Sequence, residues 1–275
     1  MTAASLDLTR PRTLGELISE TFALFGRHSG VFLTATLIVV TPVTLLVDGI
    51  WGRALAEGAG ADPAPEVSGV AAALNALVIL PLITAMHAIV VQAVARGEDM
   101  DVGDALRAAA ARLRPAVGTV LIYSLAAFAG TLLFVVPGIW IAIRWYVGVQ
   151  AAVVEDLPPM KALARSAELV RGSWWRTFGC VVTMVLVALV LASVMTAVVA
   201  AFDSPPIYVT GLILAQAVTL SLTATFGTLL YFDLRARHDV AAGAAASDGP
   251  GDAAGEWPAE RRPEAPDGWS RPGGD

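Results

Sequence analysis

Residues 115–143 read PAVGTVLIYSLAAFAGTLLFVVPGIWIAI, and these 29 residues contain no Asp, Glu, Lys or Arg. A helix that spans the hydrocarbon core needs about 20 mostly apolar residues, and an ionised side chain near the bilayer centre is costly. Pro137 and Gly138 interrupt the run, and this pair is typical of a change in chain direction. The stretch therefore predicts a helical hairpin whose second arm, Gly138 to Val154, carries Arg144.

Four further charge-free runs lie on either side of this hairpin. They have 20, 29, 26 and 29 residues and cover residues 28–47, 67–95, 177–202 and 204–232. Each run is long enough to cross a bilayer once. With the two arms of the hairpin, the sequence predicts an all-α polytopic membrane protein with six transmembrane helices.

The composition of the whole chain also favours a membrane protein. Hydrophobic residues make up 56% of the chain and charged residues 15%, whereas globular domains carry about 25% charged residues. Cys180 is the only cysteine, so the chain cannot be a disulfide scaffold. Residues 239–275 have a net charge of −5, which leaves −1 for the remainder. Since no part is strongly basic, we expect no nucleic-acid partner.

Positively charged residues alternate between the loops and so predict an orientation. The segments on one side of the predicted spans hold Arg10, Arg12, Arg27, Arg96, Arg107, Arg112, Arg114, Lys161, Arg165, Arg171, Arg176, Arg235 and Arg237. The loops on the other side hold only Arg53. Because Lys and Arg favour the cytoplasmic side, we expect both termini in the cytoplasm and the protein in the cell membrane. Residues 14–27 have helical spacing, so no removable signal peptide is expected.

Three regions are expected along the chain. Residues 1–12 form an N-terminal cytoplasmic segment, residues 13–237 the six-helix transmembrane domain, and residues 238–275 a cytoplasmic tail. The tail combines Ala, Gly, Pro and charged residues without apolar periodicity, so it cannot bury enough surface to fold and is expected to be disordered. Trp257 and Trp269 are candidate binding anchors within it.

An amphipathic segment precedes each odd-numbered span, and the three segments align without gaps. Residues 15–18, 103–106 and 160–163 correspond to one another in this alignment. Each segment is expected to be an interfacial amphipathic helix, which gives three parallel repeats of one surface helix and two spans. The alternative is that any basic amphipathic loop would look similar.

The third of these helices, from Met160 to Trp175, is the best candidate for a contact at the cytoplasmic face. Its apolar residues would lie in the headgroup layer, while Lys161, Arg165 and Arg171 would meet anionic lipid phosphates or an acidic protein partner. The alternative is that this helix only braces the fourth and fifth spans.

A search for catalytic, cofactor-binding and metal-binding patterns finds none. The three histidines, His28, His87 and His238, are dispersed, and Cys180 lies in an apolar run where a thiol is normally inert. The acidic cluster at residues 98–104 is suited to a divalent cation, but it better fits a helix cap on Asp101. We therefore expect neither a cofactor nor an enzymatic activity.

Arg144 is the residue that packing explains least. A charged residue inside a span is by default a functional hypothesis, although a long side chain also reaches the interface by snorkelling. Asp48, at the end of the first span, is the candidate partner in the same half of the membrane. Trp140 and Trp145 offer anchoring rings or a π face for the guanidinium. Arg144 and Asp48 are therefore a candidate intramembrane polar site, either as an ion pair or as a substrate contact.

Three stretches of the sequence resemble the membrane domain of the glycerophosphoryl diester phosphodiesterase membrane-domain family. They are PGIWIAIRW (137–145), ALARSAELVRGSWWR (162–176) and LLYFDLR (229–235), and the resemblance extends over about residues 13–237. In that family the membrane domain sometimes precedes a cytoplasmic phosphodiesterase domain and often stands alone. Only a short tail follows Arg237 here, so the resemblance implies a stand-alone membrane domain and transfers no active-site residue.

Two functions of different classes remain. The first is a non-catalytic membrane module that scaffolds or regulates a partner, which the absence of catalytic clusters and the family resemblance favour. The second is a carrier of a lipid or small solute, which the proline-containing spans, Arg144 and the parallel repeats favour. An intramembrane enzyme ranks third because no acid/base pair is visible.

Overall fold

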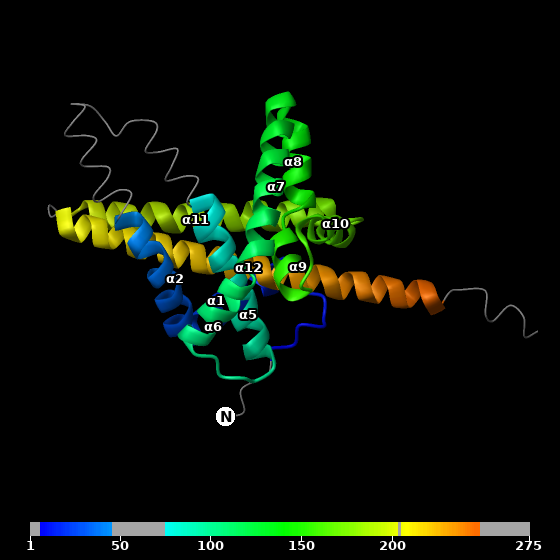
Figure 1. The fold of residues 1–275 in the computed structure, drawn as a ribbon, viewed down its shortest axis with the longest axis horizontal. Coiled ribbons are helices and arrows are strands. Elements are labelled where there is room, and N and C mark those ends of the chain that lie inside the picture. Colours follow the sequence, from blue (N-terminus) through cyan, green and yellow to red (C-terminus); the bar gives the residue numbers. More distant parts are fainter. Residues whose placement is uncertain (1–5, 46–74, 203–204, 248–275) are drawn as a thin grey trace, which may run out of the picture. The chain divides into compact units, whose positions relative to one another are not determined.

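The computed structural model describes residues 6–45, 75–202 and 205–247, and these residues form helices joined by turns (Figure 1). No strand occurs within these ranges, which confirms the prediction of an all-α fold. Five helical segments in them are long and apolar enough to cross a membrane, and a sixth is added if the bent pair α1 and α2 counts as one span. The chain is therefore a polytopic all-α protein.

Along the chain, a shorter helix precedes a long apolar helix three times. They are α1 (Leu14–Arg27), α2 (Ser29–Thr44), the π-helix η2 (Asn75–Ile79), α5 (Leu80–Ala95), α6 (Val102–Ala111), α7 (Leu113–Leu133), α8 (Val135–Arg144), α9 (Gly148–Val154), α10 (Pro159–Val170), α11 (Trp174–Ala200) and α12 (Pro205–Ser247). The shorter helices α1, α6 and α10 each precede a long apolar helix, as the predicted surface helices should. An axis change of 83° separates α1 from α2, so the first surface helix and its span have different directions. Descent of the three units from one repeat stays a prediction.

Two of the surface helices begin at side-chain caps, and only the cap on Asp101 was expected from the sequence. The side chain of Thr13 accepts from the backbone N–H of Glu16, whose carboxylate in turn accepts from the N–H of Thr13, and this reciprocal pair begins α1. Asp101 accepts from the N–H of Gly103 at 2.9 Å and begins α6. The interpretation of Asp101 as a cap is confirmed.

The hairpin turn lies earlier than predicted. Helix α7 ends at Leu133, Phe134 is extended, and Pro137 and Gly138 belong to the first turn of α8. Proline is tolerated in a first turn because its missing N–H would have no partner within the helix. Gly138 instead allows α7 and α8 to approach, since a Cβ there would lie 2.7 Å from the backbone N of Thr131. The prediction of a turn at Pro137 and Gly138 is therefore wrong by about one helical turn.

The second arm of the hairpin is also broken, at residues 145–147 between α8 and α9. Arg144 consequently ends α8 rather than lying within a continuous helix. A cation at the C-terminus of a helix is favoured by the helix dipole.

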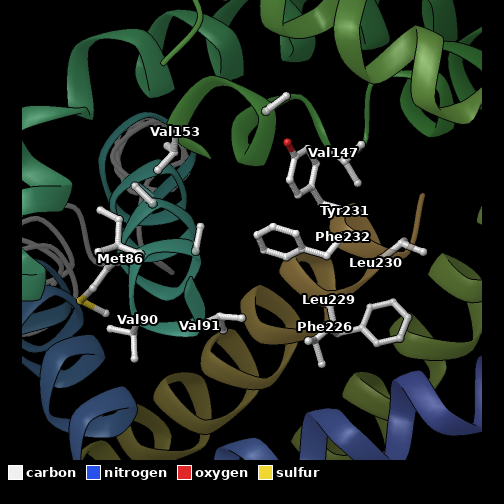
Figure 2. Packing of buried hydrophobic residues seen from close by; sticks show 14 of the residues in the cluster. Met86, Val90, Val91, Val147, Val153, Phe226, Leu229, Leu230, Tyr231 and Phe232 are labelled. Carbon is white, nitrogen blue, oxygen red and sulfur yellow. The ribbon is translucent and has the colours of Figure 1, made fainter. Parts of the chain in front are cut away.

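The core is formed mainly by α5 and α12 (Figure 2). Met86, Val90 and Val91 of α5 and Phe226 and Leu229 of α12 belong to one buried cluster. In the most apolar part of the segment formed by η2 and α5, 61% of the residues are buried, against 6% in the most apolar part of α11. Because the exposed side chains of α11 are almost all apolar, this helix presents a face suited to lipid.

Helix α12 continues to Ser247, beyond the predicted start of the tail at residue 238. Residues 241–246 read AAGAAA, and Ala has the highest helix propensity. The high helix propensity of these alanines therefore extends α12 beyond the apolar run, although residues 241–244 are exposed. The rest of the predicted disordered tail, with Trp257 and Trp269, lies outside the described residues.

Candidate functional site

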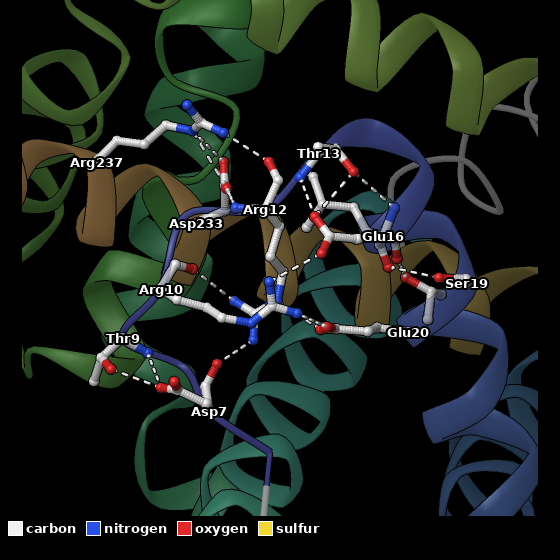
Figure 3. A network of polar contacts seen from close by, with 12 residues as sticks. Asp7, Thr9, Arg10, Arg12, Thr13, Glu16, Ser19, Glu20, Asp233 and Arg237 are labelled. Carbon is white, nitrogen blue, oxygen red and sulfur yellow. Dashed lines mark hydrogen bonds and ion pairs between the residues drawn. The ribbon is translucent and has the colours of Figure 1, made fainter.

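A buried ion cluster joins the segment before α1 to helices α11 and α12. We name Arg12, Glu20, Arg176, Asp233 and Arg237 the N-terminal ion cluster. Arg12 is 1% exposed and Asp233 is fully buried. The backbone N–H of Arg12 donates to Oδ1 of Asp233 at 2.6 Å, and its guanidinium Nε donates to Glu20 at 2.5 Å (Figure 3).

Two further guanidinium groups complete this cluster. Asp233 pairs with Arg176 at 2.6 Å and with Arg237 at 3.1 Å. Both guanidinium groups also donate to the backbone carbonyl of Arg12, at 2.7 and 2.6 Å. A buried charge is tolerated only when it is paired and hydrogen-bonded, and Asp233 meets both conditions. The cluster therefore fastens residue 12 to the start of α11 and to α12.

Sequence reasoning did not find this cluster. A partial signal existed, because Asp233 is the one acid between Asp203 and Asp239 and lies four residues before Arg237. Arg12, however, is 221 residues away from Asp233. No local pattern connects residues so distant.

The candidate contact residues on α10 separate into two kinds. Arg165 donates to both carboxylate oxygens of Glu155 at 3.2 Å and to Glu168 at 3.0 Å. The hydrogen bond from Arg165 lowers the pKa of Glu168, so this carboxylate is charged at neutral pH. Lys161 and Arg171 are exposed and have no ion pair within the described ranges. Arg165 thus forms its ion pairs within the chain, whereas Lys161 forms none in the described ranges. Arg171 also forms none, although its positive charge contributes to lowering the pKa of Glu168.

The apolar face of α10 packs against protein. Ala162, Leu163, Leu169 and Val170 are each at most 3% exposed, and α10 contacts α7, α8 and α9. Met160, which was expected on the same apolar face, is 64% exposed. The structure favours the alternative in which this helix braces its neighbours, rather than the one in which its apolar residues lie in the headgroup layer.

Arg144 has a π contact and no acidic partner among the described residues. Its guanidinium carbon lies 4.9 Å from the centre of the Trp140 ring, a distance at which a cation and an aromatic face attract each other. Asp48 lies outside the described residues. The ion pair between Arg144 and Asp48 therefore stays a prediction.

A cavity of about 250 Å³ lies between η2, α5, α7, α9 and α12. Its lining residues are all uncharged: Ala76, Leu80, Ile83, Thr84, Thr119, Val120, Tyr123, Ser124, Trp145, Tyr146, Val149, Gln150, Leu220, Thr223 and Ala224. Gln150 of α9 is 5% exposed, and its carboxamide oxygen has no hydrogen-bond partner in the described part of the chain. From the sequence alone, Gln150 is expected only to form a hydrogen bond between helices.

The described residues contain no group of three His, Cys, Asp or Glu side chains placed to hold a metal ion. His87 instead stacks on Phe32 at 4.8 Å and is fully buried, which is a packing role. Comparisons with protein-family models, curated proteins and solved structures found no match to this chain. The resemblance to the glycerophosphoryl diester phosphodiesterase membrane-domain family therefore stays a prediction.

Proposed function

We propose that this chain is a non-catalytic membrane module that scaffolds or regulates a partner at the cytoplasmic face of the cell membrane. The observation that carries the proposal is that only one of the three basic residues on and directly after α10 forms ion pairs. Arg165 is held by Glu155 and Glu168, whereas Lys161 and Arg171 are exposed and unpaired within the described ranges. The two unpaired cations are suited to anionic lipid phosphates or to an acidic segment of a protein partner.

A role in binding is also supported by the way the ionisable groups are used. Catalysis needs an acid, a base or a nucleophile that is free to reach a substrate. Arg176 and Arg237 instead both pair with Asp233, and Glu155 accepts from both Arg165 and Tyr231. These groups stabilise the fold, so we propose no enzymatic role for them.

Charge reversal tests the scaffold proposal. In the full chain, Lys161→Glu with Arg171→Glu should reduce the retention of phosphatidylglycerol or of a co-purifying partner about thirtyfold, because each of the two basic residues near a membrane contributes about 1 kcal/mol. The measurement is native mass spectrometry of protein extracted from the membrane. The matched control reverses Arg27 and Arg114, which are also exposed and form no ion pair within the described ranges. Equal losses in both double variants, or hydrolysis of lipid esters that follows the protein through purification, would overturn the proposal.

The proposed orientation has its own test. In a Cys180→Ala background, a cysteine introduced at Ala59 should react with an impermeant maleimide applied outside the cell, because the loop that contains it holds few basic residues. A cysteine at Ala108, on α6, should react only after the membrane is permeabilised. The reverse pattern would place both termini outside the cytoplasm.

A second candidate function is a carrier of a lipid or small solute. The cavity among α5, α7, α9 and α12 favours it, because a carrier needs a polar site between its spans. Gradient-driven uptake by liposomes that contain only this protein would place the carrier ahead of the scaffold.

A further inference from the structure

We propose that the cavity among η2, α5, α7, α9 and α12 binds the uncharged hydroxyl and ester head of a membrane lipid, with Gln150 as the main hydrogen-bonding residue. This inference goes beyond the scaffold role and holds whether or not the lipid is carried across the membrane. It rests on the state of Gln150, on the charge and polarity of the lining, and on the exposed apolar lining residue Leu80.

The carboxamide of Gln150 is the first observation. Gln150 lies on α9 and is 5% exposed, yet its Oε1 accepts no hydrogen bond from any described residue. A buried polar group without a partner costs about 1–3 kcal/mol. A Cβ at Gly227 of α12 would lie 2.8 Å from Nε2 of Gln150, so glycine at this position makes room for the side chain. The fold therefore accommodates a polar group for which it supplies no partner.

The other polar lining residues extend this site. Tyr123 and Ser124 of α7, Tyr146 before α9, and Thr84 of α5 all line the cavity. None of these four forms a hydrogen bond with another described residue through its side chain. Hydroxyl groups both donate and accept, and a carboxamide does the same. The cavity thus offers several donors and acceptors to one ligand.

The absence of charge from the lining determines the class of ligand. No Asp, Glu, Lys, Arg or His lines the cavity. A phosphate or an ammonium group placed there would lose its hydration without gaining an ion partner, which is strongly unfavourable. A hydroxyl or an ester carbonyl needs only hydrogen bonds. The site therefore fits an uncharged oxygen-bearing group.

An exposed apolar residue in the lining favours a lipid over a dissolved solute. Leu80 of α5 lines the cavity and is 40% exposed on an apolar helix. Ile83, Val149 and Leu220 supply apolar lining beside the polar groups. A ligand that combines an uncharged polar head with acyl chains matches both parts of this lining, because its chains remain in the bilayer beside Leu80.

The test measures binding to the full chain in detergent by native mass spectrometry. The probes are dioleoylglycerol, which is uncharged, dioleoylphosphatidic acid, which has the same chains and a charged head, and sorbitol, which is uncharged and water-soluble. We expect dioleoylglycerol to bind most tightly. Gln150→Leu should weaken this binding about tenfold, the loss expected for one hydrogen bond in a buried site.

A control and a stability measurement separate ligand binding from a structural role. Gln92→Leu on α5 should leave the affinity unchanged, because Gln92 donates to the carbonyl of Ala88 and does not line the cavity. The melting temperature of Gln150→Leu should stay equal or rise, since the substitution removes an unpartnered polar atom. Tyr146→Phe, which deletes only a hydroxyl group, should weaken binding as well and serves if Gln150→Leu does not fold.

Three results would overturn the proposal. The first is tighter binding of phosphatidic acid or sorbitol than of dioleoylglycerol by the unaltered chain. The second is unchanged affinity in both Gln150→Leu and Tyr146→Phe. The third is a lower melting temperature of Gln150→Leu with unchanged affinity, which would assign Gln150 a purely structural role. The charge-reversed variant of Lys161 and Arg171 should still bind dioleoylglycerol, so failure of the scaffold proposal leaves this test intact.

Discussion

Asp233→Ala is expected to destabilise the protein by about 3–5 kcal/mol, because removing one partner of a buried ion pair leaves the other charges uncompensated. The substitution removes the acceptor for the backbone N–H of Arg12 and the counter-ion of Arg176 and Arg237. The midpoint of unfolding in detergent, followed by circular dichroism, measures the loss. Release of the segment before α1 should also expose the chain near Arg12 to limited proteolysis.

Asp104→Ala is the matched control for this prediction. Asp104 pairs with Arg107 at 2.6 Å, but its side chain is 64% exposed. Exposed ion pairs contribute about 0–1 kcal/mol, so this variant should unfold close to the midpoint of the unaltered protein. Similar small losses in both variants would mean that the N-terminal ion cluster does not hold the segment before α1 in place.

Gly138→Ala is expected to have the second-largest effect, a loss of about 1–3 kcal/mol with a reduced folded yield. The new Cβ would lie 2.0 Å from Oγ1 of Thr131 and 2.7 Å from its backbone N and Cα. A side-chain oxygen can rotate away, but backbone atoms cannot. Helices α7 and α8 would have to separate along the hairpin. Thermal unfolding in detergent and the yield after size-exclusion chromatography measure the effect.

Two variants test this explanation. Adding Thr131→Ala to Gly138→Ala should rescue little stability, because the backbone contacts at 2.7 Å remain. Gly179→Ala on α11 should be neutral or slightly stabilising, since no atom lies within 4 Å of the new Cβ and Ala favours helices. Full rescue by Thr131→Ala would show that only the side chain of Thr131 opposes a larger residue at position 138.

For several residues of the candidate site, the sequence predicted the chemical character of the side chain but not its partners. Arg165 was recognised as a cation on an amphipathic helix, but its pairing with Glu155 and Glu168 was not. Trp140 and Trp145 were both expected as anchoring rings or a π face for Arg144, and the structure shows the π contact with Trp140. Gln150 was noted as polar, yet nothing in its neighbourhood along the chain indicated a cavity.

The sequence by itself determined the properties that depend on neighbours along the chain. Charge-free runs of 20 to 29 residues predicted the apolar helices, and Asp101 predicted where the second surface helix begins. These properties are local because helix hydrogen bonds, capping and the cost of a charge in lipid all act within a few residues.

Only the tertiary structure decided which distant residues meet. It brought Arg12 to Asp233, placed Gly138 against Thr131, and enclosed Gln150 among four helices. The position of the hairpin turn belongs here too, because the close approach of α7 and α8 determines where Gly138 must lie. The physical reason is that close packing and buried ion pairing depend on the shape and charge of whole surfaces, and residues far apart in the sequence form these surfaces jointly.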